Sequence, residues 1–189
     1  LSVSEVEDAF ARVLAYESFG DSQTRGELAR VAIVVVEAAH IDVEQKKDFV
    51  LFALRELRKE IEGPNKNVKH LMVAAYLLRE ARFLDASFIA EEEKCLLKAI
   101  ELSPTKQPIQ IDLAGLYINS GRGAAAVKLL ENAWKLDPRF SLAARYLIVA
   151  GLLEGRLDLV AEVERGMDFE RWTAADLSQL GPAHHQAQN

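Results

Sequence analysis

The sequence predicts an all-α protein in which helix-turn-helix repeats stack into a right-handed superhelix. The composition is rich in helix-forming residues, with only 10 Gly and 5 Pro among 189 residues. Alternating strand patterns joined by tight turns are nearly absent. In addition, one sequence pattern recurs after 34 residues. Half of the residues are hydrophobic (50%), so a chain of this length can bury a continuous core.

Short breakers separate the expected helices in order along the chain. Residues 20–22 (Gly-Asp-Ser), 41–42 (Ile-Asp) and 63–65 (Gly-Pro-Asn) divide the first four. Asp42, followed by Gln45, has the spacing of a capping box. Proline explains several later boundaries, because it fixes φ and lacks an N–H. We expect helices near 2–19, 22–40, 43–62, 67–80, 87–102, 107–119, 122–136, 141–154 and 157–167, and a short one near 170–180.

The repeat is visible in two kinds of position. The segment at 99–104 (Ala-Ile-Glu-Leu-Ser-Pro) recurs at 133–138 as Ala-Trp-Lys-Leu-Asp-Pro, so that Pro104 and Pro138 lie 34 residues apart. Gly121 and Gly155 have the same separation. A period of 34 residues with two helices in each period is typical of the tetratricopeptide repeat (TPR).

Between Pro104 and Pro138 the TPR pattern is nearly complete. Its positions are occupied by Leu113, Ala114, Tyr117, Gly121, Ala126, Leu130, Ala133 and Pro138. A small residue such as Ala126 is expected where the two helices cross closely, and Tyr117 is expected to fill the gap between them.

The flanking repeats follow the pattern less well. The pair at 141–167 has Gly151 at the tyrosine position and Val160 at the alanine position, and the pair at 67–104 is about six residues too long. Degenerate outer repeats are expected because terminal units face water. We therefore predict N-terminal helices at 1–64 (a cap and a degenerate pair), TPR repeats at 65–168, a capping helix at 169–181 and a disordered tail at 182–189.

Composition and motifs argue against several chemistries. A net charge of -6 disfavours nucleic-acid surfaces, and a single cysteine, Cys95, excludes an internal disulfide and multi-cysteine metal sites. The four histidines have neither metal nor triad spacing, and no catalytic or phosphate-binding motif occurs. We predict no catalytic residues, no cofactor and no metal. No apolar run is long enough to span a bilayer. Because the chain begins without Met, we expect a fragment of a larger protein.

The predicted working surface is the concave groove that the first helices of stacked repeats form. Eight residues are projected into it: Leu71, Met72, Arg79, Asp112, Ile118, Asn119, Arg145 and Tyr146. Such a surface suits an extended peptide or a helix, with Arg145 and Tyr146 as anchors. The alternative is that these residues contact the chain's own C-terminal cap. Only Asn119 and Arg145 match the carboxylate clamp of chaperone-binding TPR domains, so that role is not favoured.

Several stretches resemble the C-terminal TPR region of bacterial O-antigen ligase-like (polymerase/ligase) membrane proteins. They are Leu-Ala-Tyr-Glu-Ser-Phe-Gly at 14–20 with Arg25 and Leu28, then 53–65, 99–104 with Gln107, and 133–138, and the overlong repeat around 85–88 also fits. The resemblance implies a multi-pass parent in the bacterial inner membrane that transfers or polymerises lipid-linked glycans. Its catalytic residues would lie outside this chain.

Two functions of different kinds follow from these patterns. The first is a non-catalytic protein-interaction module that forms the appendage of such a membrane protein, on an unspecified side of the membrane. The second is a free-standing cytoplasmic TPR adaptor or co-chaperone that binds a peptide in its groove. A glycan-binding groove is a third possibility. None of these predicts nucleic-acid binding or insertion of this chain into a membrane.

Overall fold

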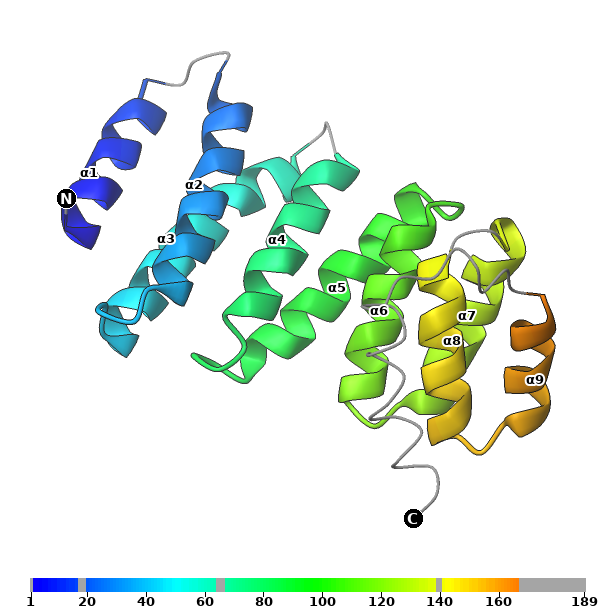
Figure 1. The fold of residues 1–189 in the computed structure, drawn as a ribbon. Helices are drawn as coiled ribbons and strands as arrows, with labels where there is room; N and C mark the ends of the chain where they lie inside the picture. Colours follow the sequence, from blue (N-terminus) through cyan, green and yellow to red (C-terminus); the bar gives the residue numbers. More distant parts are fainter. Residues whose placement is uncertain (1, 17–19, 64–66, 139–140, 167–189) are drawn as a thin grey trace. The chain divides into compact units, whose positions relative to one another are not determined.

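The computed structural model describes residues 2–16, 20–63, 67–138 and 141–166, and within these ranges the chain forms nine α-helices and no strand (Figure 1). The chain divides into two compact units, Leu1–Leu102 and Ser103–Asn189, each of which is described by itself. Unit 1 contains α1 (Val3–Leu14), α2 (Asp21–Glu37), α3 (Val43–Glu62), α4 (Val68–Glu80) and α5 (Ser87–Leu102). Unit 2 contains α6 (Gln107–Asn119), α7 (Gly123–Leu136), α8 (Ser141–Leu153) and α9 (Leu157–Arg165).

The predicted all-α repeat architecture is confirmed, and most helix boundaries agree within a few residues. The first helix is the exception, since it ends at Leu14 rather than near residue 19. The helix predicted near 170–180 and the predicted tail lie outside the described residues. The predicted boundary between residues 64 and 65 concerns the type of repeat and stays a prediction, whereas the two compact units meet between Leu102 and Ser103.

Local side-chain caps explain where several helices begin. Ser2 and Glu5 form a reciprocal capping box at the start of α1. Asp42 accepts a hydrogen bond of 2.9 Å from the Gln45 N–H at the start of α3, which is the N-cap half of the capping box that the spacing predicts. Asp85 caps α5 by accepting a 2.9 Å bond from the Ser87 N–H. These caps satisfy N–H groups that have no partner within the helix.

The two glycines at 34-residue spacing end α6 and α8 in the same way. Gly121 has φ 69° and Gly155 has φ 67°, a left-handed conformation that disfavours any side chain with a Cβ. In each turn the next N–H reaches back five residues, from Arg122 to the Tyr117 carbonyl and from Arg156 to the Gly151 carbonyl, both at 2.8 Å. This is a Schellman turn, and it explains why glycine recurs with the repeat.

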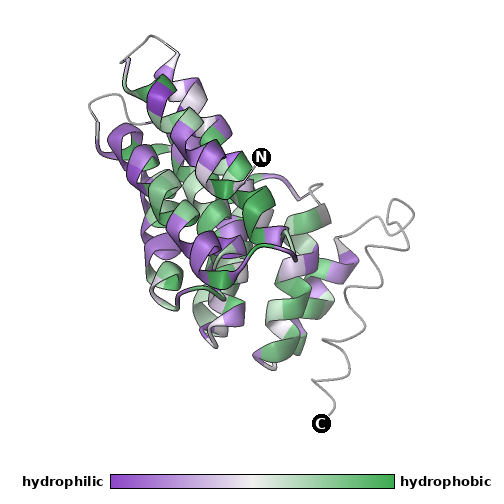
Figure 2. Cartoon of the chain, turned by 90° about the vertical axis from the view of Figure 1, so that its left-hand side faces the viewer, coloured by the Kyte–Doolittle hydropathy of each residue, from purple (hydrophilic) through white to green (hydrophobic). Residues whose placement is uncertain are grey.

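The core of unit 2 is apolar and continuous across its four helices. Ala126, Leu130 and Ala133 of α7 are 0% exposed, as are Ala143 and Leu147 of α8. The helices of both units carry alternating hydrophobic and hydrophilic bands, as amphipathic helices do (Figure 2). Burial of the apolar bands between neighbouring helices stabilises each unit.

Unit 1 adds buried charge to its apolar core. Arg25 of α2 reaches α3, where its guanidinium lies 2.6 Å from Glu60 and 3.5 Å from Glu56. Arg82, in the turn after α4, makes two 2.7 Å hydrogen bonds to Glu92, which is only 2% exposed. Because both partners of each pair are largely removed from water, these bonds fix how the helices of unit 1 pair.

Candidate functional site

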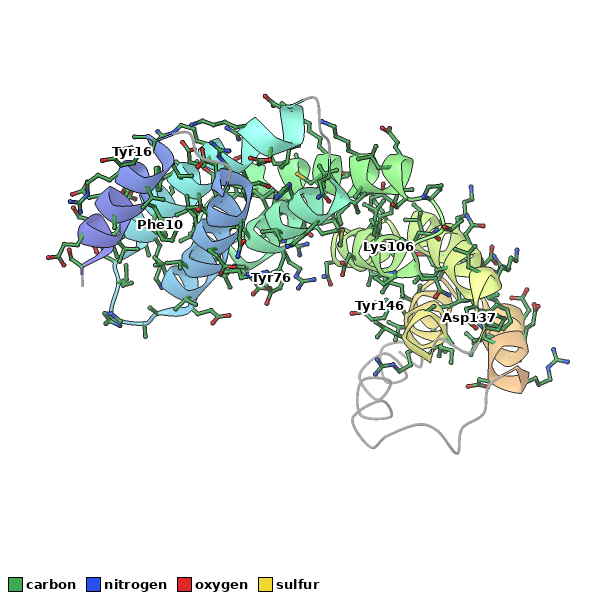
Figure 3. The ribbon with its side chains drawn as sticks, turned by 90° about the horizontal axis from the view of Figure 1, so that it is seen from above. Phe10, Tyr16, Tyr76, Lys106, Asp137 and Tyr146 are labelled. Carbon is green, nitrogen blue, oxygen red and sulfur yellow. The ribbon has the colours of Figure 1, made fainter. Side chains whose placement is uncertain are left out.

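The helices alternate between two roles within each unit. The A helices are the first helices of the pairs (α2 and α4 in unit 1, α6 and α8 in unit 2), and the B helices are the second (α3 and α5, α7 and α9). Neighbouring A helices pack against each other, α2 on α4 and α6 on α8. In Figure 3, the A helices of unit 1 lie on one side of that unit and its B helices on the other. The A-helix side is the surface on which the predicted groove residues were placed.

On the A-helix side of unit 1, α4 presents a tyrosine and an arginine in contact. Tyr76 is 42% exposed and projects outward from α4 (Figure 3). The Arg79 guanidinium lies over the Tyr76 ring, 4.6 Å from its centroid, and also pairs with Glu80 at 3.3 Å. Met72 is half-buried on the same helix. Because Met72, Tyr76 and Arg79 are four and three residues apart, they share one face of α4.

Leu71 does not lie with these residues. It is 1% exposed and shares its face of α4 with Ala74 and Leu78, three and seven residues further along. That face looks toward α3 and α5 and forms the floor of a cavity on the B-helix side of unit 1. Leu71 and Met72 are consecutive and therefore about 100° apart around the helix, so they face different neighbours.

On the A-helix side of unit 2, Tyr146 of α8 packs against α6. Its ring carbon Cε1 lies 3.6 Å from the position that a Cβ would take on Gly115. Asp112 comes three residues before Gly115 and Asn119 four residues after it, so they lie on the same face of α6. Asp112 is half-buried and Asn119 is exposed. Tyr146 therefore approaches the face of α6 that carries Asp112, Gly115 and Asn119.

The other predicted residues of unit 2 lie at or below this surface. Arg145 and Tyr146 are both half-buried, and Tyr146 also packs against the core of the unit. Ile118 is half-buried and packs against the same core. The structure therefore gathers Asp112, Asn119 and Tyr146 around Gly115 in unit 2, and Met72 and Arg79 around Tyr76 in unit 1.

Two residues at the centre of these surfaces were missed by the sequence reasoning. Tyr76 could have been found, because it lies four residues after Met72 and three before Arg79, which is the spacing of one helix face. Gly115 carries no such signal. Its role depends on the approach of Tyr146 from a helix about thirty residues away in the chain, which only the packing of α6 on α8 reveals.

The described residues contain neither a metal-binding cluster nor a membrane-spanning helix. No group of three or more His, Cys, Asp or Glu within the described ranges is placed to hold a metal ion. Over the same part of the chain, no helix combines the length and the apolar character needed to cross a membrane. Burial raises the pKa of the Cys95 thiol to about 11, with the nearby Glu91 carboxylate adding to the shift, so this thiol is protonated near neutral pH.

Comparison with known proteins supports the fold. No family model matches the sequence, and no curated protein is significantly similar to it. Among solved structures, the chain is similar to TTC0263, a thermophilic TPR protein of Thermus thermophilus. The TM-score is 0.57 at 18% sequence identity, over 98% of this chain and 90% of that chain. These comparisons do not support the resemblance to O-antigen ligase-like proteins. The fold of the chain is therefore that of a TPR-like helical-repeat protein.

Proposed function

We propose that this chain is a non-catalytic protein-interaction module that binds a peptide or helix on its A-helix surfaces. The observation that carries the proposal is the stacked Tyr76–Arg79 pair on α4, in which the aromatic ring is 42% exposed. Tyrosine and arginine are enriched among the residues that contribute most binding energy at protein interfaces. Because the arginine is already ordered on the ring, it loses less side-chain entropy when a partner binds.

Arg145 and Tyr146 on α8 are the corresponding residues of unit 2. Tyr146 is half-buried and lies against Gly115, so its ring has a defined orientation. Asn119, exposed one turn beyond Gly115, adds a hydrogen-bonding amide that a peptide backbone can use. A partner chain with apolar or aromatic anchors and acidic side chains suits these residues.

A finer proposal is that the module serves as the appendage of an O-antigen ligase-like membrane protein. The stretch at 14–20 supports it, because this stretch resembles the C-terminal region of such proteins. The alternative is a free-standing adaptor. The gene sequence upstream of Leu1 distinguishes them: a run of transmembrane helices supports the appendage, and a start codon close to Leu1 supports the adaptor.

The binding proposal is tested by affinity capture from membrane and soluble fractions, using the immobilised chain and two A-helix variants. One variant carries Tyr76→Ala with Arg79→Ala, and the other Arg145→Ala with Tyr146→Ala. The matched control is Lys128→Ala with Lys135→Ala, because both lysines are exposed on the B helix α7. We expect a partner that is lost with an A-helix variant and kept with the control. A partner retained by both A-helix variants would place binding elsewhere.

A further inference from the structure

The B-helix side of unit 1 contains a cavity that is separate from the A-helix surfaces. It lies between α3 and α5, with α4 as its floor, and has a volume of about 360 Å³. Ligand-binding pockets commonly measure roughly 300–1,000 Å³, so this cavity is of a suitable size for a small ligand. We refer to it as the α3–α5 cavity.

The floor of the α3–α5 cavity is apolar. Its lining comes from three helices and consists of Leu54, Leu57 and Ile61 of α3, Leu71, Ala74 and Leu78 of α4, and Cys95 of α5. The raised pKa of the Cys95 thiol, which burial mainly causes, is consistent with a poorly hydrated floor. Such a lining favours an aliphatic or aromatic group over a polar one.

The rim of the cavity is charged, and its charged groups differ in the hydrogen bonds that they already make. Arg58 of α3 donates to Glu91 of α5 at 2.7 Å, so these two charges largely offset each other across the cavity. Lys98 donates one hydrogen bond of 3.2 Å to the Ile61 carbonyl. An ammonium group has three N–H donors, so Lys98 can donate further bonds. Lys94 is exposed and lines the same cavity.

The rim therefore has an excess of positive charge. It carries three basic residues (Arg58, Lys94 and Lys98) and two acidic ones (Glu62 and Glu91), although the net charge of the whole chain is -6. Lys94 and Lys98 lie one helical turn apart, at i and i+4, so their ammonium groups can approach one anion together. An apolar floor below two lysines is complementary to a ligand with one aliphatic chain and one anionic head.

We propose that the α3–α5 cavity binds a medium-length aliphatic monocarboxylate, with its chain on the apolar floor and its carboxylate between Lys94 and Lys98. The charge excess at the rim argues against a neutral or cationic amphiphile. The site is independent of peptide binding, because its lining residues belong to the opposite side of unit 1 from Tyr76 and Arg79.

Cys95 provides a built-in test, since it is the only cysteine in the chain and lines the cavity. An occupied cavity should slow its alkylation by iodoacetamide, an uncharged reagent, at pH 9, where a measurable fraction of the thiol ionises. Decanoate is the probe, and decyltrimethylammonium is its control, with the same chain and a positive head. We expect decanoate to slow alkylation at concentrations at which decyltrimethylammonium does not.

Charge removal tests the role of the two lysines. In the variant Lys94→Gln with Lys98→Gln, calorimetry should show decanoate binding weakened about tenfold or more, as expected for the loss of charge-assisted hydrogen bonds. The variant Lys128→Gln removes an exposed lysine of unit 2 and should bind like the wild type. Circular dichroism establishes that each variant is folded.

Several outcomes would overturn the proposal. No protection of Cys95 by decanoate would refute binding in the cavity. Equal protection by both amphiphiles would refute recognition of the carboxylate and would indicate an apolar site, such as one for the side chain of a partner protein. Unchanged affinity for decanoate in the lysine variant would likewise refute recognition of the carboxylate by Lys94 and Lys98. If that variant does not fold, the comparison of decanoate with decyltrimethylammonium on the wild-type chain still tests whether the cavity recognises a carboxylate.

Discussion

The two helix pairs of unit 2, α6–α7 and α8–α9, share their turns but fill the space between their helices differently. Both turns use a left-handed glycine, Gly121 or Gly155, with the same 2.8 Å reach-back hydrogen bond. At the positions where α6–α7 has Tyr117 and Ala126, α8–α9 has Gly151 and Val160.

The exchange at these positions is a compensation of volume. A Cβ added to Gly151 would lie 2.9 Å from Cγ2 of Val160, so the larger residue on α9 occupies the room that the smaller one on α8 leaves. Close packing explains why the two must change together. The backbone turn favours glycine through its left-handed φ, whereas the residues that fill the space between the helices can change if their combined volume is kept.

The largest expected effect comes from breaking this compensation. Gly151→Tyr restores the TPR residue but should clash with Val160, destabilising unit 2 by about 3 kcal/mol through overpacking. Adding Val160→Ala should recover about 2 kcal/mol, because it recreates the tyrosine–alanine combination of α6–α7. Urea denaturation followed by circular dichroism measures both variants. Strictly additive effects of the two substitutions would show that the residues do not compensate.

The volume argument also applies to α6–α7, where the large residue is on the first helix and the small one on the second. Ala126→Leu inserts bulk at a position that is 0% exposed and should destabilise the chain by about 2 kcal/mol. Hydrogen exchange measured by mass spectrometry should show faster exchange in α6 and α7. A urea midpoint equal to that of the wild type would contradict the close crossing of these helices.

The shared turns should respond equally to substitution. Gly121→Ala and Gly155→Ala should each cost about 1 kcal/mol, because alanine disfavours the left-handed conformation. No atom lies within 4 Å of the added Cβ at either position, so the cost is conformational alone. Gly26→Ala, in the middle of α2 and equally open, is the matched control and should stabilise the chain by about 0.5–1 kcal/mol. Thermal melts of the three variants compare them, and stabilisation by either turn variant would be inconsistent with the observed φ.

The smallest expected effect concerns Gly115. Its added Cβ would meet Tyr146 at 3.6 Å, an ordinary van der Waals contact, so Gly115→Ala should stabilise α6 by about 0.5 kcal/mol. Peptide binding that involves Tyr146 should be unaffected by alanine and weakened by the larger Gly115→Leu. A loss of stability in the alanine variant would mean that Tyr146 cannot adjust to the methyl group.

Most of the helix and turn structure could be predicted because its signals are local. The Asp42 cap acts on Gln45, three residues away, and the Gly121 turn closes over five residues, so both can be recognised in the sequence. The 34-residue period then indicates the repeat type without reference to any contact between helices. The end of α1 is predicted less well, since the breaker at residues 20–22 places it near residue 19, whereas the helix ends at Leu14.

The candidate site was predictable only in part, because its composition depends on which face of a helix meets a neighbour. Met72 and Arg79 share a face with Tyr76. The sequence placed Leu71 with them, but Leu71 is buried in the floor of the α3–α5 cavity. A repeat consensus describes an average helix and does not resolve a rotation of about 100° between consecutive residues.

By itself, the sequence of this protein determined the all-α class, most of the helix boundaries, the glycine turns and the period of the repeat. The first three depend on interactions among residues a few positions apart, and the period is visible as a recurrence in the sequence. Only the tertiary structure decided the contacts between distant residues, such as the bond of 3.2 Å between Ser22 and the buried His70, the pairing of Arg25 with Glu60, and the cavity between α3 and α5. These depend on how far neighbouring helices separate and rotate, which is set by the packing of whole helix faces.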